Sequence, residues 1–188
     1  MIRPIPESEV TQLVFHGTTI LALRHKEKVI VAGDGQVTLN ATIVKHKAKK
    51  VRRIYNEKII VGFAGATADA LHLSERLESK LERYNGNLTR AAVELAREWR
   101  TDKYLRRLEA MMIAVDENRT FLLSGNGDII EPDEGVVGIG SGGVIVQAAA
   151  TALVRHSHLE PREIVEISMA IAASLCVYTN TDITIEEL

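Results

Sequence analysis

The sequence has little cysteine, little proline and no repetitive tract. Cys176 is the single cysteine among 188 residues, so no disulfide can form within one chain. Proteins that depend on no disulfide are typical of reducing compartments, which favours a cytoplasmic location. The length suits one domain, and it allows a sizeable hydrophobic core without covalent cross-links.

A charge excess and a long hydrophobic run are absent too. The 23 Lys and Arg against 25 Asp and Glu give a net charge of −2, so no basic excess points to nucleic acid or an acidic membrane. No stretch approaches the roughly 18 apolar residues of a membrane helix. Residues 1–17 lack the apolar run of an export signal. We expect them to be a disordered leader that is removed, and 18–188 to form one domain.

The apolar residues alternate in blocks of strands and helices. Two strand pairs come first, two helices follow, then more strands and two final helices. Segregated blocks favour antiparallel sheets over a parallel β-α-β sheet. We therefore predict an α+β fold with four αββα layers: two facing sheets with a helix pair outside each. The predicted elements are 18–23, 29–32, 49–55, 58–64, 67–85, 88–99, 111–115, 120–124, 129–131, 136–139, 144–157 and 161–177. The last helix is apolar nearly all round, which indicates a buried helix.

Thr18, after Gly17, opens the first predicted strand of the domain. Threonine is common in strands, so this position alone decides nothing. A threonine hydroxyl is a weak nucleophile that needs an adjacent base. An N-terminal threonine supplies its own base, because its α-amine has a pKa of about 8. Inside a chain that nitrogen is an amide, so cleavage between Gly17 and Thr18 would activate the residue.

Lys50 lies in a basic run, 45–53, that is compatible either with a solvated surface or with an inward-facing lysine on a strand. A buried ammonium beside Thr18 would lower the pKa of its amine and hydroxyl. Such a cation needs a carboxylate partner. Asp34, between Gly33 and Gly35, is a candidate, although an aspartate between glycines is also common in plain turns.

Two glycine-containing junctions are further candidates. Gly65 lies between a strand and a helix, where its N–H could stabilise an oxyanion or where glycine could serve close packing alone. Residues 138–143 match the G-x-G-x-x-G pattern of dinucleotide sites. However, a helix rather than a parallel strand follows, which disfavours nucleotide binding. Ser141 in this loop could instead orient an N-terminal amine.

The histidines show no metal-ligand spacing, and Cys176, on an apolar helix, is predicted to be a core thiol. Nothing in the residues themselves therefore identifies a metal site.

From Thr18 to Leu188 the sequence resembles the proteasome β-type peptidases. The resemblance depends on many segments at matching spacing: 18–20, 32–38, 49–53, 62–65, 67–70, 98–102, 124–128, 139–143, 177–180 and 184–188. It implies the αββα fold of N-terminal-nucleophile hydrolases and a threonine endopeptidase. It also implies two stacked six-membered rings, and an AAA+ unfoldase that uses the ATP and delivers unfolded proteins.

The resemblance also assigns roles to individual residues. Thr18 matches the nucleophile, Lys50 the catalytic lysine and Asp34 its supporting acid. Ser141 matches the serine near the amine, and Gly65 the glycine whose N–H faces the oxyanion. No organic cofactor is implied. The resemblance further implies a sodium ion bound through main-chain carbonyls, at the matching positions Ala173, Cys176 and Thr179.

Two alternative functions remain open from the sequence. The same fold and nucleophile also serve amidohydrolases that act on small amides, and these would be expected as monomers or dimers. The fold also serves as a non-catalytic ring subunit, and such a subunit would never expose Thr18.

Overall fold

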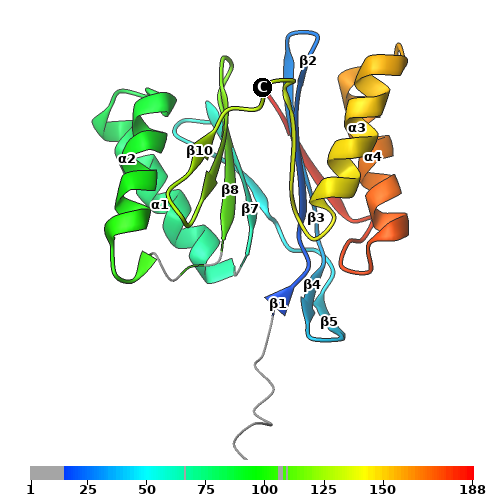
Figure 1. Cartoon of the computed structure of the whole chain (residues 1–188), viewed down its shortest axis with the longest axis horizontal. Coiled ribbons are helices and arrows are strands. Elements are labelled where there is room, and N and C mark those ends of the chain that lie inside the picture. The colour runs from blue at the N-terminus through cyan, green and yellow to red at the C-terminus, as the bar shows by residue number, and fades with distance from the viewer. Residues whose placement is uncertain (1–14, 66, 106–107, 109) are drawn as a thin grey trace, which may run out of the picture.

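Figure 1 shows a computed structural model of the chain, which describes residues 15–65, 67–105, 108 and 110–188. The elements follow the predicted order of strands, two helices, strands and two helices, with a further strand at the end. They are β1 (Phe15–His16), β2 (Thr19–His25), β3 (Lys28–Asp34), β4 (Val37–Leu39), β5 (Thr42–Lys45), β6 (Val51–Ile54), β7 (Ile59–Ala64), α1 (Thr67–Arg83), α2 (Leu88–Thr101), β8 (Met111–Val115), β9 (Thr120–Ser124), β10 (Ile129–Ile130), β11 (Val136–Gly140), α3 (Gly143–His156), α4 (Pro161–Leu175) and β12 (Ile183–Glu187).

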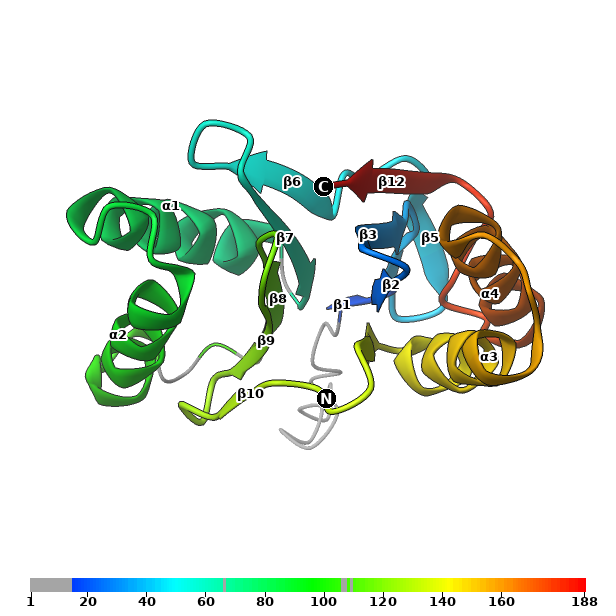
Figure 2. The same cartoon turned by 90° about the horizontal axis from the view of Figure 1, so that it is seen from above.

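Two antiparallel sheets form the middle of the molecule. One has the strand order β11-β2-β3-β12 and the other the order β10-β9-β8-β7-β6. Seen from above, they lie face to face, with α1 and α2 outside one sheet and α3 and α4 outside the other (Figure 2). The predicted four-layer αββα arrangement is therefore confirmed. A small third sheet, β1-β4-β5, lies at one end of the two large sheets (Figure 1).

Three buried clusters hold the four layers together. The cluster between the sheets includes Ile20, Val31 and Ile113. A second joins α1 and α2 to their sheet around Trp99, and a third joins α3 and α4 to theirs around Met169. Burial of apolar area at about 25 cal/mol per Å² is the main stabilising contribution of such clusters.

The helix spacing read from the sequence is confirmed in α2. Its buried residues recur at helical spacing on one face, namely Leu88, Ala91, Ala92, Leu95, Ala96 and Trp99. The helix begins after Asn87, whose side-chain oxygen accepts a hydrogen bond from the main-chain N–H of Arg90. Gly86, with φ +79°, provides the left-handed residue that separates α1 from α2.

Two local predictions near the end of the chain are wrong. Helix α4 is buried on one face only, because Ile167, Ile171 and Leu175 are 39%, 37% and 66% exposed. Cys176 is not a core thiol: α4 stops short of the predicted residue 177, so Cys176 is its C-cap and is partly exposed. In α4 and at Cys176, apolar residue type does not entail complete burial.

The last residues of the predicted leader are ordered, and the removal of residues 1–17 stays a prediction. Residues 1–14 lie outside the described part of the chain, but Phe15 and His16 form β1, which pairs with Leu39 and Thr38 of β4. The hairpin of β4 and β5 and the final strand β12 were not predicted as strands. Pairing with β4 leads the backbone of Gly17 into the space between β4 and Lys50.

Candidate active site

Thr18 lies immediately before β2, the strand between β3 and β11. Its main-chain oxygen accepts a hydrogen bond from the N–H of Ser141 at 2.7 Å. The N–H of Thr19 donates to Oδ1 of Asp34, also at 2.7 Å. Thr18 is 7% exposed. The backbone around Thr18 is thus fixed from both neighbouring strands.

The Lys50 side chain lies beside Thr18, as the inward-facing alternative predicted. Its Nζ donates to Oδ1 of Asp34 at 2.8 Å, to the carbonyl of Gly17 at 2.7 Å and to the carbonyl of Gln36 at 2.6 Å. An ammonium has three donor hydrogens, so these acceptors use all of them. Only 8% of this side chain is exposed. The solvated-surface alternative therefore does not apply to Lys50.

Asp34 is fully buried and makes its ion pair with Lys50 as predicted. Its Oδ1 accepts from Thr19 and Lys50, and its Oδ2 accepts from the N–H groups of Gln36 at 2.9 Å and Asn180 at 3.5 Å. A buried carboxylate is tolerated only when its lone pairs are satisfied in this way. Asp34 is the acceptor that connects Lys50 to β2 and to the segment after α4.

Burial lowers the pKa of the Lys50 ammonium, because the charged form loses its hydration. The negative charge of Asp34 and its hydrogen bond act in the opposite direction and raise that pKa, but they only partly offset the desolvation. Lys50 therefore loses its proton more readily than a lysine in water.

The bond between Gly17 and Thr18 is intact in this structure, and its carbonyl is polarised. The Gly17 oxygen accepts from Lys50 Nζ and from the Thr18 hydroxyl, both at 2.7 Å. The hydroxyl oxygen is therefore close to the carbonyl group that it would have to attack. Gly17 has φ +108°, and a Cβ at this position would lie 2.9 Å from the Gln36 oxygen, so glycine is required here.

Ser141 follows β11 and Gly65 follows β7, two elements other than β2. Ser141 is exposed and follows Gly140, whose φ is +87°. A Cβ on Gly140 would lie 2.1 Å from the Thr18 oxygen and 3.3 Å from the Cβ of Ala64. Gly65 directly follows Ala64, at the end of β7, with φ +136°. Gly140 and Gly65 both have positive φ. The Ser141 N–H contacts the Thr18 carbonyl directly, whereas Gly65 is next in sequence to Ala64, which lies beside Gly140.

The three positions matched to a sodium site lie in the last turn of α4 and in the segment that follows it. The last carbonyls of a helix lack helical partners and carry a partial negative charge, which suits a cation. Ala173 lies in the last turn, Cys176 is the C-cap and the Thr179 N–H donates to the Cys176 carbonyl at 3.1 Å. The donor type therefore fits a hard monovalent cation.

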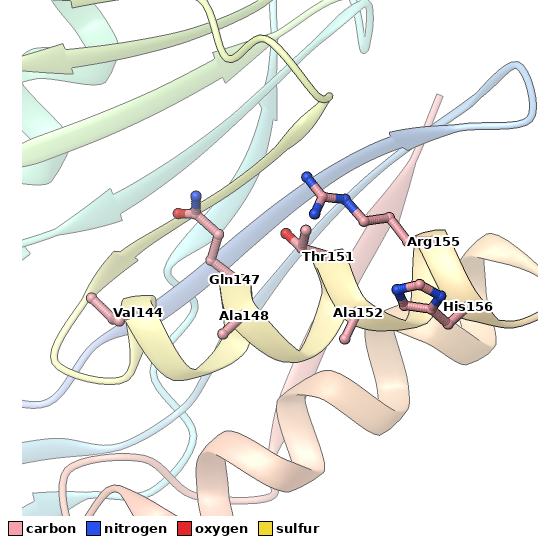
Figure 3. A pocket seen from close by; sticks show the side chains of 7 residues that line it. All are labelled: Val144, Gln147, Ala148, Thr151, Ala152, Arg155 and His156. Atoms are coloured by element: carbon pink, nitrogen blue, oxygen red, sulfur yellow. The ribbon is translucent and has the colours of Figure 1, made fainter.

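The G-x-G-x-x-G segment serves a different purpose from nucleotide binding. The N–H of Gly142 donates to the side chain of Thr19 at 3.0 Å, and a Cβ on Gly142 would lie 2.3 Å from that same oxygen. The pattern therefore allows close approach of α3 to β2. The pocket drawn in Figure 3 lies on the outer face of α3, between Val144 and His156, and none of the predicted catalytic residues lines it.

Two residues that contact the site, and one contact within it, were missed from the sequence. Gln36 and Asn180 bind Asp34 through their main-chain N–H groups. The hydroxyl of Thr19, which is fully buried, lies 2.7 Å from that of Thr179. The contact of Gln36 could have been predicted, because Gln36 lies two residues from Asp34 in the sequence. The contacts of Asn180 and Thr179 could not, because these residues lie more than 140 positions away from their partners.

The αββα fold and the hydrogen-bonded group of Thr18, Lys50 and Asp34 define the class: the threonine peptidases among the N-terminal-nucleophile hydrolases. The family of proteasome subunits matches residues 14–188, and the chain belongs to that family. It is 59% identical over 177 residues to the ATP-dependent protease subunit HslV of Syntrophobacter fumaroxidans, covering 94% of this chain and 99% of that protein. It is also similar to the crystal structure of HslV from Trypanosoma brucei, with a TM-score of 0.86, 44% identity, and coverage of 90% of this chain and 98% of that one.

Proposed function

We propose that the chain is the threonine peptidase subunit of an ATP-dependent protease that degrades unfolded proteins, as its similarity to HslV (ClpQ) supports. The observation that carries the proposal is the shared contact at Gly17. The Lys50 ammonium and the Thr18 hydroxyl both reach the one carbonyl whose cleavage would free the Thr18 amine.

Processing is the first step of the proposed function. The Thr18 oxygen attacks the Gly17 carbonyl carbon, and Lys50 stabilises the oxyanion. The hydroxyl proton passes to the Thr18 nitrogen as the C–N bond breaks, which leaves an ester between Gly17 and Thr18. Water then hydrolyses the ester, releases residues 1–17 and leaves a free amine on Thr18.

Peptide hydrolysis uses the same atoms with a new base. The free Thr18 amine, directly or through a water, takes the hydroxyl proton, and the oxygen attacks a substrate carbonyl. The N–H of Gly65 stabilises the oxyanion, and Ser141 orients the amine. Asp34 holds the Lys50 ammonium, whose positive charge lowers the pKa of the nearby amine and hydroxyl. Water releases the acyl group and restores the enzyme.

Assembly and location complete the proposal. We expect two stacked hexameric rings of this chain, with the AAA+ unfoldase of the family, HslU (ClpY), supplying unfolded substrate and hydrolysing the ATP. No helix of the described residues is long and apolar enough to cross a membrane, and we expect a cytoplasmic complex. The main-chain carbonyls of Ala173, Cys176 and Thr179 would hold a sodium ion, which would fix the segment after α4.

Intact mass measurement tests the processing step. The purified protein should lack residues 1–17, whereas a Thr18→Ala variant should keep them. A wild-type protein that still carries Gly17 after assembly would contradict the proposal. The same outcome would contradict any role of Thr18 as the nucleophile.

A Lys50→Ala variant tests the proposed catalytic lysine. To separate catalysis from processing, it should be made in a chain in which a cleavable fusion replaces residues 1–17. Cleavage of the fusion then leaves Thr18 at the N-terminus. Peptide turnover should fall by at least about 100-fold, the usual order for loss of an electrostatic group at an oxyanion or nucleophile. Light scattering should show the same ring assembly as in the wild-type protein. Near-normal turnover would overturn the role of Lys50.

A further inference from the structure

Gln36 contacts both members of the buried ion pair through its backbone. Its N–H donates to Oδ2 of Asp34 at 2.9 Å, and its carbonyl accepts from Lys50 Nζ at 2.6 Å. The residue is 3% exposed. Gln36 lies between β3 and β4, so no strand pairing holds its backbone in place.

The side chain of Gln36 supplies the missing anchor. Its Nε2 donates to the carbonyl of Val177 at 2.9 Å and to the Thr38 hydroxyl at 3.0 Å. Val177 follows α4, some 140 positions later in the chain, so the amide ties the backbone around residue 36 to a distant element. Both donor hydrogens of this buried amide are used, as a buried polar group requires.

The carbonyl of Gln36 becomes more important once the leader is gone. Lys50 has three acceptors in the uncut chain, and one of them is the Gly17 carbonyl. Cleavage and departure of residues 1–17 remove that acceptor. The position of the ammonium then depends on Asp34 and on the Gln36 carbonyl, and the third donor hydrogen is left facing Thr18.

We propose that Gln36 is a positioning residue, whose side-chain anchor on Val177 and Thr38 holds its own carbonyl against Lys50 and thereby sets the place of the ammonium beside Thr18. This inference depends on the proposed function of Lys50. Gln36 acts through Lys50, whose ammonium its carbonyl contacts. Its contribution is geometric, and misplacement of a catalytic group by about 1 Å can cost on the order of 100-fold in rate.

Gln36→Met is the most direct test, because it keeps the length of the side chain and removes both donors. In the processed, assembled enzyme we expect the kcat for a peptide substrate to fall by about 10- to 100-fold, with KM changed less than about twofold. Weaker hydrogen bonding to the charged ammonium should also move the alkaline limb of the pH profile to lower pH. Thr38→Val removes one acceptor and should show a smaller loss in the same direction.

A variant that only loses stability provides the control. Asn87→Ala removes a side-chain hydrogen bond to the backbone at the start of α2, far from Lys50, and should lower the melting temperature without changing the pH profile. A Gln36→Met enzyme with kcat within twofold of wild type and an unmoved alkaline limb would overturn the inference. So would a loss that Asn87→Ala reproduces. If Lys50→Ala were active, the proposed function would fail instead, which distinguishes the two failures.

Discussion

Replacing Asp34 by asparagine would leave the Lys50 ammonium buried without its counter-charge. Both Asp34 oxygens accept hydrogen bonds, and the donors come from four residues: Thr19, Gln36, Lys50 and Asn180. An asparagine has one acceptor oxygen, so its NH₂ group would face donors whichever way the amide turns. The variant therefore loses an ion pair and gains opposed donors at a fully buried position.

The expected magnitude follows from the burial of this pair. Removing one partner of a buried ion pair typically costs about 3–5 kcal/mol. For a chain of this length, 1 kcal/mol corresponds to about 2–4 °C in melting temperature. Asp34→Asn should therefore lower the melting temperature by roughly 6–20 °C, and it should reduce peptide turnover because Lys50 would be displaced.

The pH dependence of this loss has a definite sign. In the variant, the pKa of Lys50 falls further, because Asp34 no longer raises it. The unfolded chain then binds more protons than the folded chain between the lowered pKa and the ordinary value of 10.5. Stability of the variant rises with pH in that window, so the gap to wild type should narrow as the pH increases.

The assay is thermal unfolding at equal protein concentration, because assembly itself affects the transition. An Asp34→Asn/Lys50→Met double variant, which removes the buried charge, should recover part of the loss. A melting temperature for Asp34→Asn within about 2 °C of wild type would refute the reasoning. A gap that widens with pH would refute it as well.

The remaining predictions concern the loop, the core and the pH profile. Gly140→Ala forces a side chain into a left-handed conformation and against the Thr18 oxygen; peptide turnover in a kinetic assay should fall, while a change confined to melting temperature would contradict it. Leu95→Ala leaves a cavity under α2 at a fully buried position, and denaturant unfolding should show a loss of about 2–5 kcal/mol with unchanged turnover per folded molecule. Because the pKa of Lys50 is lowered from 10.5, peptide turnover in a pH series should already decline below pH 10.5, as Lys50 loses its proton. Lys50→Arg should shift this decline to higher pH.

Much of the fold could be predicted because its information is local. The 3.6-residue period of α2 and the short apolar runs of β2 and β3 are set by neighbours in the chain, and the structure confirms the layers they imply. The short strands β4, β5 and β12 carry too few residues or too mixed a pattern to stand out. Their pairing is decided by tertiary contacts, which a local pattern does not record.

The same distinction between local and tertiary information applies to the residues of the candidate site. Thr18, Asp34 and Lys50 were suggested by the chemistry of their residue types, and the structure brings them together. Thr179 and Asn180 carry no such chemical signature. They reach the site because the chain leaves α4 at Leu175 and then passes beside β3. That path is set by the packing of whole elements, not by the local sequence.

The way β2 begins has a consequence for the new chain end. Ends of chains usually fray, because nothing holds their last residues. Here the carbonyl of Thr18 and the N–H of Thr19 are both already hydrogen-bonded, to Ser141 and Asp34. A chain cut after Gly17 would therefore have an N-terminus whose backbone is already held in place by hydrogen bonds. Most of the entropy of orienting the amine is lost when the domain folds, so each substrate meets a nucleophile that is already in place.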